Sequence, residues 1–466
     1  MVFSSVVFIF CFLPLVYGIN CLCGNRLSNV VLLIASVFFY AWGEPLYVIL
    51  IIISIFINYL IGILIGNASS KKAKKGGLLV GVIFDLVVLG YYKYSGMLVD
   101  IFTHLLGRDH LISYNAVALP IGISFFTFQE ISYLVDVYKN EATYSHNIID
   151  VALYISFFPQ LIAGPIVKYH DICEYLRNRS VTFAGTADGY KRFTYGLSKK
   201  VLIANELGTC VDKIYALNLT GITSLIAWVG AVAYTFQIYY DFSGYSDMAI
   251  GLGQMFGFTL PENFDYPYIS HSITEFWRRW HITLGSWFRQ YVYIPLGGSR
   301  RGNIRTYVNL IVVFCLTGLW HGANMSFALW GLLNGLFIIV ERKWIGQGLS
   351  RHRWFSMVYC FIIEIFCWVL FRADSITYAV GFVGRMIFPW KNESGIRLEA
   401  FLNSKFVVVM ILAVFGAGFF QSLIPSKVKK RWRGSVLEGI YCVVILIFSI
   451  ASIASGTYNP FIYFQF

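Results

Sequence analysis

The sequence predicts an all-α integral membrane protein whose helices cross the bilayer many times. Of its 466 residues, 58% are hydrophobic and only 13% are charged, whereas a soluble domain is about 25% charged. The mean hydropathy is +0.66, and apolar runs of about 20 residues, long enough to cross a bilayer, recur along the chain. Short polar connectors separate these runs. The chain therefore has too little polar surface for a soluble fold.

The apolar runs predict about 10 to 12 membrane segments. The clearest candidates are 3–20, 28–43, 46–66, 77–96, 148–166, 222–240, 306–340, 354–371, 404–424 and 436–455. Weaker candidates are 116–137, 187–206 and 281–296. Neither an internal repeat nor a soluble domain interrupts this pattern, so residues 1–466 are expected to form a single membrane domain.

The basic residues of the chain lie mainly in the connectors. They give a net charge of +12, from 36 Lys and Arg against 24 Asp and Glu. This placement favours membrane orientation and anionic lipid headgroups as the explanation of the charge, and no nucleic-acid-binding motif accompanies it. The basic run 71–75 predicts a cytoplasmic loop, and counting back through the three preceding spans places the N-terminus outside.

The nine cysteines do not form a recognisable ligand pattern. Their spacing matches neither a zinc site nor a disulfide framework. Most lie in apolar runs, where cysteine serves as a small core residue. No metal site is therefore expected.

One histidine, His321, lies in the middle of a long run without charge. The 35 residues 306–340 contain no Asp, Glu, Lys or Arg, and a single helix of that length would measure about 52 Å, against a hydrocarbon core of about 30 Å. The run is therefore expected to tilt steeply or to break, most naturally in the glycine-flanked segment 317–324. An ionisable group at this depth suggests a functional site, and neutral imidazole is suited to act as a general base. A structural histidine that bridges helices and a haem ligand are the alternatives.

The segment 274–291 is rich in tryptophan and arginine. Read as one helix, it places its large apolar side chains on one side and its arginines mostly elsewhere, which predicts an interfacial or re-entrant helix. The helix either anchors the protein at the membrane surface or lines a path for an anionic donor, whose phosphates arginine would bind. Within it, His281 follows Trp280 as His321 follows Trp320, although a surface histidine is the alternative for His281. The apolar side consists of Trp277, Trp280, Leu284, Trp287, Phe288 and Tyr291.

Two further groups of polar residues interrupt apolar stretches. They are expected either to line a polar cavity or to join helices by hydrogen bonds. The loop 261–267 has a proline at each end and is predicted to be fixed. The first group is Ser124, Thr127, Gln129 and Glu130, and the second is Gln237, Asp241, Ser243, Ser246 and Asp247.

Six long strings stand out, in order, over nearly the whole chain. They are SFFTFQEISYLVDVY (124–138), FFPQLIAGPIVKY (157–169), DFSGYSDMAIGLGQMFGF (241–258), LPENFDYPY (260–268), FWRRWHITLGSWFRQYVYIPLGG (276–298) and LTGLWHGANMSFALWGLLNG (316–335). These strings resemble the bacterial membrane-bound O-acyltransferase family, most closely its alginate O-acetylation branch. The D-alanyl transfer branch, whose donor is a carrier protein, is similar overall but matches less well in 241–268 and around His321.

The resemblance implies a ring of transmembrane helices around a thinned centre, with funnels from both sides. It implies that the essential histidine of the family is His321, and that the second family position, which is His or Asn, is His281. It also implies acetyl-coenzyme A as a cytoplasmic donor, no bound cofactor and a location in the bacterial cytoplasmic membrane. The remaining partners implied are membrane lipids, an extracytoplasmic SGNH-hydrolase-like protein and a polysaccharide acceptor.

The expected function is therefore O-acetyl transfer from a cytoplasmic thioester toward hydroxyls outside the cytoplasm. His321 is expected to act as the general base, and His281 to orient the donor or polarise its carbonyl. D-alanyl transfer from a carrier protein, a non-catalytic channel for donor or polysaccharide, and an assembly scaffold are the alternatives. The positions expected to bind the donor are Arg278, Arg279, Trp280, Trp320 and Asn324.

Overall fold

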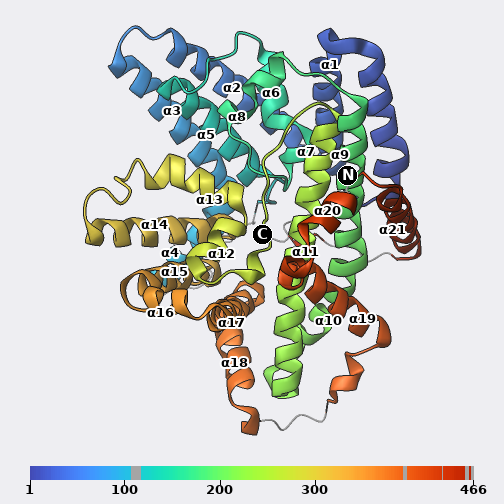
Figure 1. Cartoon of the computed structure of the whole chain (residues 1–466). Coiled ribbons are helices and arrows are strands. Elements are labelled where there is room, and N and C mark those ends of the chain that lie inside the picture. Colours follow the sequence, from blue (N-terminus) through green and yellow to red (C-terminus); the bar gives the residue numbers. More distant parts are fainter. Residues whose placement is uncertain (107–116, 392–395, 433, 457–460, 463–466) are drawn as a thin grey trace. The chain divides into compact units, whose positions relative to one another are not determined.

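The computed structural model describes residues 1–106, 117–391, 396–432, 434–456 and 461–462. Helices account for most of these residues, and no strand occurs among them (Figure 1). The all-α prediction is thus confirmed. The chain divides into two compact units, the first made of Met1–Phe193 with Met248–Pro261 and the second of Thr194–Asp247 with Glu262–Phe466. That residues 1–466 act as a single domain stays a prediction.

Several helices of the described residues have the length and composition of membrane spans. Five are long and apolar enough to cross a bilayer, and four more are apolar but shorter. They agree with the predicted multi-pass class, while the total of about 10 to 12 segments stays a prediction. The five are Tyr47–Asn67, Asn303–His321, Met325–Leu349, Arg353–Arg372 and Val436–Ser455, and the four are Phe8–Gly24, Leu27–Gly43, Ile376–Ile387 and Ser404–Phe419.

The first unit begins with two apolar helical segments, Phe8–Gly24 and Leu27–Gly43, which meet at a kink inside α1. Gly24 has φ 63°, a left-handed backbone that glycine tolerates without a steric penalty, and it separates the predicted segments 3–20 and 28–43. The helices of this unit are η1 (Phe8–Phe12), α1 (Leu13–Gly43), α2 (Tyr47–Asn67), α3 (Lys71–Leu89), η2 (Gly90–Tyr94), α4 (Ser95–Leu105), α5 (Ile123–Lys139), α6 (Ile148–Ser156), α7 (Phe158–Leu161) and α8 (Tyr169–Arg177).

Helices α2, α3 and α5 pack against one another and bury polar side chains between them. Asn58 of α2 donates from Nδ2 to Oδ1 of Asp85 in α3, at 2.8 Å. Lys93 of η2 donates from Nζ to Oγ of Ser124 in α5, at 3.1 Å. For Ser124, the structure thus shows the interhelical hydrogen bond that was one of its two predicted roles.

The predicted apolar segment 148–166 is not one continuous helix. Helix α6 ends at Ser156, and the short helix α7 begins at Phe158 after Phe157 takes an extended ψ of 111°. Pro159 stands in the first turn of α7, where its missing N–H leaves no hydrogen bond unmade. The prediction of one spanning segment over 148–166 is therefore corrected. Pro159 prevents α6 from continuing as a helix into the following residues.

The second unit contains the segments that hold both candidate histidines. Helices α9 (Phe183–Ser198) and α11 (Ser224–Met255) have residues in each unit. The remaining helices are η3 (Lys199–Ala204), α10 (Asn205–Tyr215), η4 (Leu219–Gly221), η5 (Pro267–Ile269), α12 (Ile273–Arg279), α13 (Ile282–Phe288), η6 (Arg289–Tyr293), α14 (Asn303–His321), α15 (Met325–Val340), η7 (Glu341–Ile345), α16 (Gly346–Arg351), α17 (Arg353–Arg372), α18 (Ile376–Ile387), η8 (Pro389–Lys391), η9 (Leu398–Ala400), α19 (Ser404–Val414), η10 (Phe415–Phe419), η11 (Gln421–Leu423), α20 (Ser426–Trp432) and α21 (Val436–Ser455).

Helices α14 and α15 form a tight hairpin, so the long uncharged run is two helices rather than one. The break lies at 322–324, inside the segment where it was predicted. Two glycines, one in each helix, let the backbones of α14 and α15 approach each other closely. A Cβ on Gly318 would lie 2.1 Å from the carbonyl oxygen of Phe327, and one on Gly331 would lie 2.1 Å from that of Phe314. His321 is the last residue of α14 and therefore lies at the closed end of the hairpin.

A buried ion pair lies beside α11 in the second unit. Lys200 Nζ and Asp241 Oδ1 are 2.5 Å apart, and their side chains are 4% and 2% exposed. The other carboxylate oxygen of Asp241 accepts the backbone N–H of Ile462 at 2.9 Å. Asp241, one of the polar residues singled out in the sequence, thus connects three segments of the second unit.

Candidate active site

The predicted helix 274–291 is broken at the candidate histidine. Helix α12 ends at Arg279, α13 begins at Ile282, and His281 between them has φ 44° and ψ 52°. The break has a long-range cause, since the backbone N–H of Ile282 donates at 3.0 Å to the carbonyl of Asn263 in the loop 261–267. The prediction that 274–291 forms one continuous helix is therefore wrong, while its interfacial or re-entrant position stays a prediction. The two short helices present their residues in different directions from those of a single helix.

Asn263 holds the turn that contains His281. Its side-chain oxygen lies 3.0 Å from Nδ1 of His281 and accepts the hydroxyl of Thr283 at 2.9 Å and its backbone N–H at 3.3 Å. Its amide nitrogen donates to Ser246 Oγ at 3.0 Å. Asn263 and His281 are both 0% exposed. These bonds fix which end of the amide faces His281, because only the oxygen is able to accept from Thr283.

The amide orientation determines which nitrogen of His281 carries its proton. An amide oxygen only accepts, so Nδ1 of His281 must be the donor. In the neutral ring, Nε2 is then the nitrogen with the lone pair, and Nε2 has no hydrogen-bond partner among the described residues. Complete burial, with no carboxylate bonded to the ring in the described part of the chain, favours this neutral form. His281 therefore presents a proton acceptor to its surroundings, not a donor.

The second histidine, His321, lies close to the first. The ring centroids of His281 and His321 are 6.4 Å apart, although the residues are forty positions apart in the sequence. His321 is 3% exposed. The ring of Trp320 is 5.9 Å from His281 and 4.9 Å from His321, between centroids. The histidines of the two Trp-His pairs thus meet at one buried place, with Trp320 beside both.

Aromatic rings enclose the two imidazoles. His321 contacts Trp330 and Phe371 edge to face, each at 5.3 Å between centroids. His281 contacts Phe242 edge to face at 4.7 Å. Trp280 packs instead on Trp368, at 4.8 Å between ring centroids. The surroundings are therefore apolar, which strengthens electrostatic interactions with a reacting group.

The residues expected to bind the donor lie in different settings. Arg278 is exposed. Arg279 is partly buried and donates from Nε to Glu275 at 2.9 Å and from Nη1 to Asp265 at 3.2 Å. Asn324 is exposed and caps α15, since its Oδ1 accepts the backbone N–H of Ser326 at 3.1 Å. Arg278 is thus available to an anion, whereas Arg279 and Asn324 already have structural contacts.

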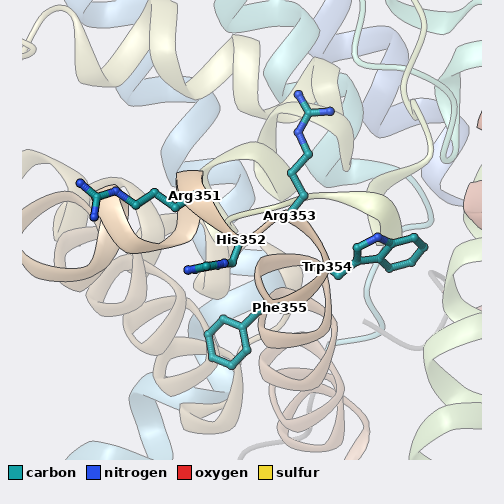
Figure 2. A pocket seen from close by; sticks show the side chains of 5 residues that line it. All are labelled: Arg351, His352, Arg353, Trp354 and Phe355. Atoms are coloured by element: carbon teal, nitrogen blue, oxygen red, sulfur yellow. The ribbon is translucent and has the colours of Figure 1, made fainter.

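A separate surface hollow lies at the junction of α16 and α17. Figure 2 shows its lining, which consists of Arg351, His352, Arg353, Trp354 and Phe355. Trp354 is 79% exposed and Phe355 is 68% exposed. Cationic and aromatic side chains together are typical of the headgroup level of a membrane. Because neither His281 nor His321 lines this hollow, it is distinct from the histidine site.

Comparison with known proteins identifies the family. The sequence profile of the membrane-bound O-acyltransferase family matches residues 37–376, which is more than half of the chain. The chain belongs to the membrane-bound O-acyltransferase family. As a member of this family it is a multi-pass membrane acyltransferase, in agreement with its apolar helices. The family resemblance seen in the sequence is thereby confirmed.

Three relatives illustrate the range of the family. The chain is 40% identical to the probable alginate O-acetylase AlgI of Pseudomonas putida, over 100% of both chains. It is 35% identical to the peptidoglycan O-acetyltransferase of Helicobacter pylori, over 83% of this chain and 80% of the relative. It is 25% identical to the teichoic acid D-alanyltransferase of Streptococcus thermophilus, over 48% of this chain and 57% of the relative.

Sequence reasoning found both histidines but missed the residue that orients one of them. The loop 261–267 was predicted to be fixed, yet nothing local indicated that Asn263 faces His281, which follows 18 residues later. The available signal was weak. It consisted of one amide in a proline-bounded loop, a short distance before a tryptophan-rich segment.

Proposed function

We propose that this membrane-bound O-acyltransferase passes an acetyl group from a cytoplasmic thioester toward hydroxyls outside the cytoplasm. The observation that carries the proposal is the pair of buried imidazoles, His281 and His321, 6.4 Å apart in an aromatic enclosure. Two neutral imidazoles in an apolar setting are suited to proton transfer near neutral pH. The identity to acetylating relatives over the whole chain supports acetyl as the acyl group.

The donor in this proposal is acetyl-coenzyme A, which approaches from the cytoplasmic side. Arg278, which is exposed, is the first candidate to bind its phosphates, and the exposed arginines at 300–305 are further candidates. The other residues expected to bind the donor have a mainly structural part in this path. Arg279, Trp280 and Asn324 already contact neighbouring side chains or backbone, and Trp320 is the fourth of these residues. No resident cofactor is part of the mechanism.

The chemical step is a direct acyl transfer. His321 removes the proton from the acceptor hydroxyl, the hydroxyl oxygen attacks the thioester carbonyl, and the carbon–sulfur bond breaks. The thiolate that leaves then takes the proton from His321, so both the proton and the electron pairs balance. General-base help of this kind contributes roughly 10²–10⁴-fold.

His281 has a more restricted part in this step. Its neutral Nδ1–H form offers only a lone pair at Nε2. It therefore orients the donor, or accepts a proton, through Nε2. Polarising a carbonyl would require a second proton on the ring.

The proposal extends to the acceptor and the location of the protein. The acceptor is an extracytoplasmic polysaccharide, reached directly or through an extracytoplasmic SGNH-hydrolase-like partner. The protein lies in the bacterial cytoplasmic membrane with its N-terminus outside and the loop 71–75 inside. The basic and aromatic hollow at 351–355 suits contact with lipid headgroups on one face.

The test is acetyl transfer by purified protein in detergent or nanodiscs. Wild type is mixed with radiolabelled acetyl-coenzyme A and a short β-linked oligosaccharide, and both free thiol and acetylated product are measured. We expect His321→Ala to lower the rate at least about 10²-fold, and His146→Ala, an exposed histidine elsewhere, to leave it unchanged. Equal rates for wild type and a folded His321→Ala protein would overturn the assignment.

The same assay separates the alternatives. D-alanyl transfer predicts label from a D-alanyl carrier protein and none from acetyl-coenzyme A. A channel or a scaffold predicts no thiol release above the protein-free rate. The D-alanyl alternative is the less favoured one, because the likeness to that relative covers only 48% of this chain.

A further inference from the structure

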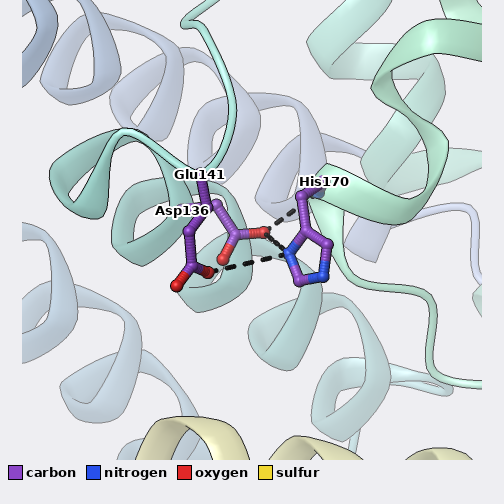
Figure 3. Close-up of side chains that lie close together, drawn as sticks. All are labelled: Asp136, Glu141 and His170. Atoms are coloured by element: carbon purple, nitrogen blue, oxygen red, sulfur yellow. Dashed lines mark hydrogen bonds and ion pairs between the residues drawn. The ribbon is translucent and has the colours of Figure 1, made fainter.

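We propose that Asp136, Glu141 and His170 form a binding site for a divalent transition-metal cation of the zinc class. The three side chains come from the end of α5, the turn after it and the start of α8, as Figure 3 shows. One ligand-type atom from each lies within 4.8 Å of the other two. Nitrogen and carboxylate oxygen are ligands that zinc accepts, commonly with a water in the fourth position. This site lies in the first unit and is independent of the two candidate catalytic histidines.

The backbone holds these three residues in place. Asn140 takes a left-handed conformation with φ 58°, which ends α5 and turns the chain back. The N–H of Glu141 then donates at 2.9 Å to the carbonyl of Asp136. The backbone N–H of His170 donates at 3.0 Å to Asp136 Oδ2. The cluster is therefore built by the fold and does not depend on side-chain contacts alone.

The orientation of His170 matches that of a metal-bound imidazole. Its Nδ1 faces Asp136 Oδ2 at 2.8 Å and Glu141 Oε2 at 3.9 Å, while its Nε2 faces Asp171 Oδ1 at 3.2 Å. In metal sites the nitrogen that does not bind the metal almost always donates to a carboxylate, carbonyl or water. In the tautomer that carries its proton on Nε2, directed at Asp171, the ring turns the Nδ1 lone pair toward the other two carboxylates.

When the Nδ1 lone pair is directed at two carboxylates, a cation between the three ligand atoms would offset their mutual repulsion. A proton on Nδ1 would satisfy Asp136, but Glu141 at 3.9 Å is beyond hydrogen-bond reach of that nitrogen. A cation with several ligands uses both carboxylates at once, and their two negative charges match a divalent ion. Two lysines lie at the edge of the cluster. Lys139 Nζ is 3.7 Å from Glu141 Oε1, and Lys168 Nζ is 3.8 Å from Asp171 Oδ2.

Burial and access are both compatible with an exchangeable ion. The Asp136 side chain is 0% exposed, and a charge buried to this extent needs a close counter-charge. His170 is 24% exposed and Glu141 is 39% exposed, which leaves a path from solvent. Asp136 and His170 are 34 positions apart in the sequence. For this reason the spacing of residues in the sequence predicted no metal site.

The experiment titrates Zn²⁺ into the full-length protein in detergent after treatment with a chelator. We expect one saturable site, read by competition with a zinc indicator and by a rise in the thermal midpoint. X-ray absorption at the zinc edge should show nitrogen and oxygen ligands without sulfur. Absence of saturable 1:1 binding would overturn the proposal.

Variants separate this site from incidental surface binding. Glu141→Gln keeps the hydrogen bond from the backbone N–H of His170 to Asp136, and should therefore fold while its zinc affinity falls at least tenfold. Asp171→Asn should weaken zinc binding by about 10- to 100-fold, because it alters the partner of His170 Nε2, the ring nitrogen that does not bind the metal. Glu174→Gln alters an exposed glutamate of the same helix α8 and is the matched control. Equal affinity for Glu141→Gln and Glu174→Gln would contradict the proposed ligand set.

Discussion

The side-chain oxygen of Asn263 lies 3.0 Å from Nδ1 of His281 and determines which ring nitrogen carries the proton. We expect Asn263→Ala to lower the turnover rate of acetyl transfer about 10²-fold, because the ring loses the contact that fixes its tautomer. Stability should fall by about 1–3 kcal/mol, because Thr283 and His281 are left buried without their acceptor and Ser246 without its donor.

Two further variants test whether Asn263 acts through His281. Asn263→Asp keeps an acceptor oxygen, and a carboxylate there favours the charged imidazole. It should recover part of the rate, with the acid limb of the pH–rate profile moved to higher pH. Asn303→Ala, at an exposed asparagine, is the control. A normal turnover rate and pH profile in folded Asn263→Ala would rule out a positioning role.

The two adjacent arginines of α12 should respond differently to substitution. Arg278 is exposed, so Arg278→Ala should raise the KM for acetyl-coenzyme A several-fold with little change in thermal stability. Arg279 is bonded to Glu275 and Asp265, and Arg279→Ala should lower the thermal midpoint. Steady-state kinetics and a thermal melt on the same samples check both. An unchanged KM in Arg278→Ala would remove this residue from the donor path.

The hairpin of α14 and α15 depends on the absence of a side chain at Gly331. A Cβ there would meet the Phe314 carbonyl at 2.1 Å, so Gly331→Ala should force the helices apart. We expect a loss of about 1–3 kcal/mol and a lower acetyl-transfer rate, since His321 ends the same hairpin. Gly384→Ala in α18, where a Cβ meets nothing within 4 Å, should be neutral or slightly stabilising in the same melt.

The buried pair of Lys200 and Asp241 should make an asymmetric contribution to stability. Lys200→Met leaves the Asp241 charge buried without its partner, which typically costs about 3–5 kcal/mol. Replacing both, as Lys200→Met with Asp241→Leu, should restore much of the lost stability, because no charge is then buried. Thermal melts of the two proteins are the measurement, and equal midpoints would show that the charge is compensated in another way.

Features with a local cause could be predicted from the sequence. The absence of charge in 306–340 and the glycines around His321 were enough to place the break between α14 and α15. The Trp-His pairs at 280–281 and 320–321 identified both histidines that the fold brings together. Pro159 was also a local signal, and it explains why the predicted segment 148–166 was too long.

Features with a distant cause could not be predicted. The backbone at His281 is turned by Asn263, which lies in another segment, so the periodicity of 274–291 still indicated one helix. Glu141 and His170 likewise meet only because α5 and α8 pack together. Hydropathy and helical spacing carry no information about which loops face each other.

The left-handed backbone of His281, with φ 44°, limits how this position varies during evolution. Side chains rarely adopt that conformation, and glycine, asparagine and aspartate do so most readily. The turn therefore restricts which residue types fold at this position, independently of the chemistry. A combinatorial library at this position would recover folded proteins mainly from these few residue types, whichever reaction is screened.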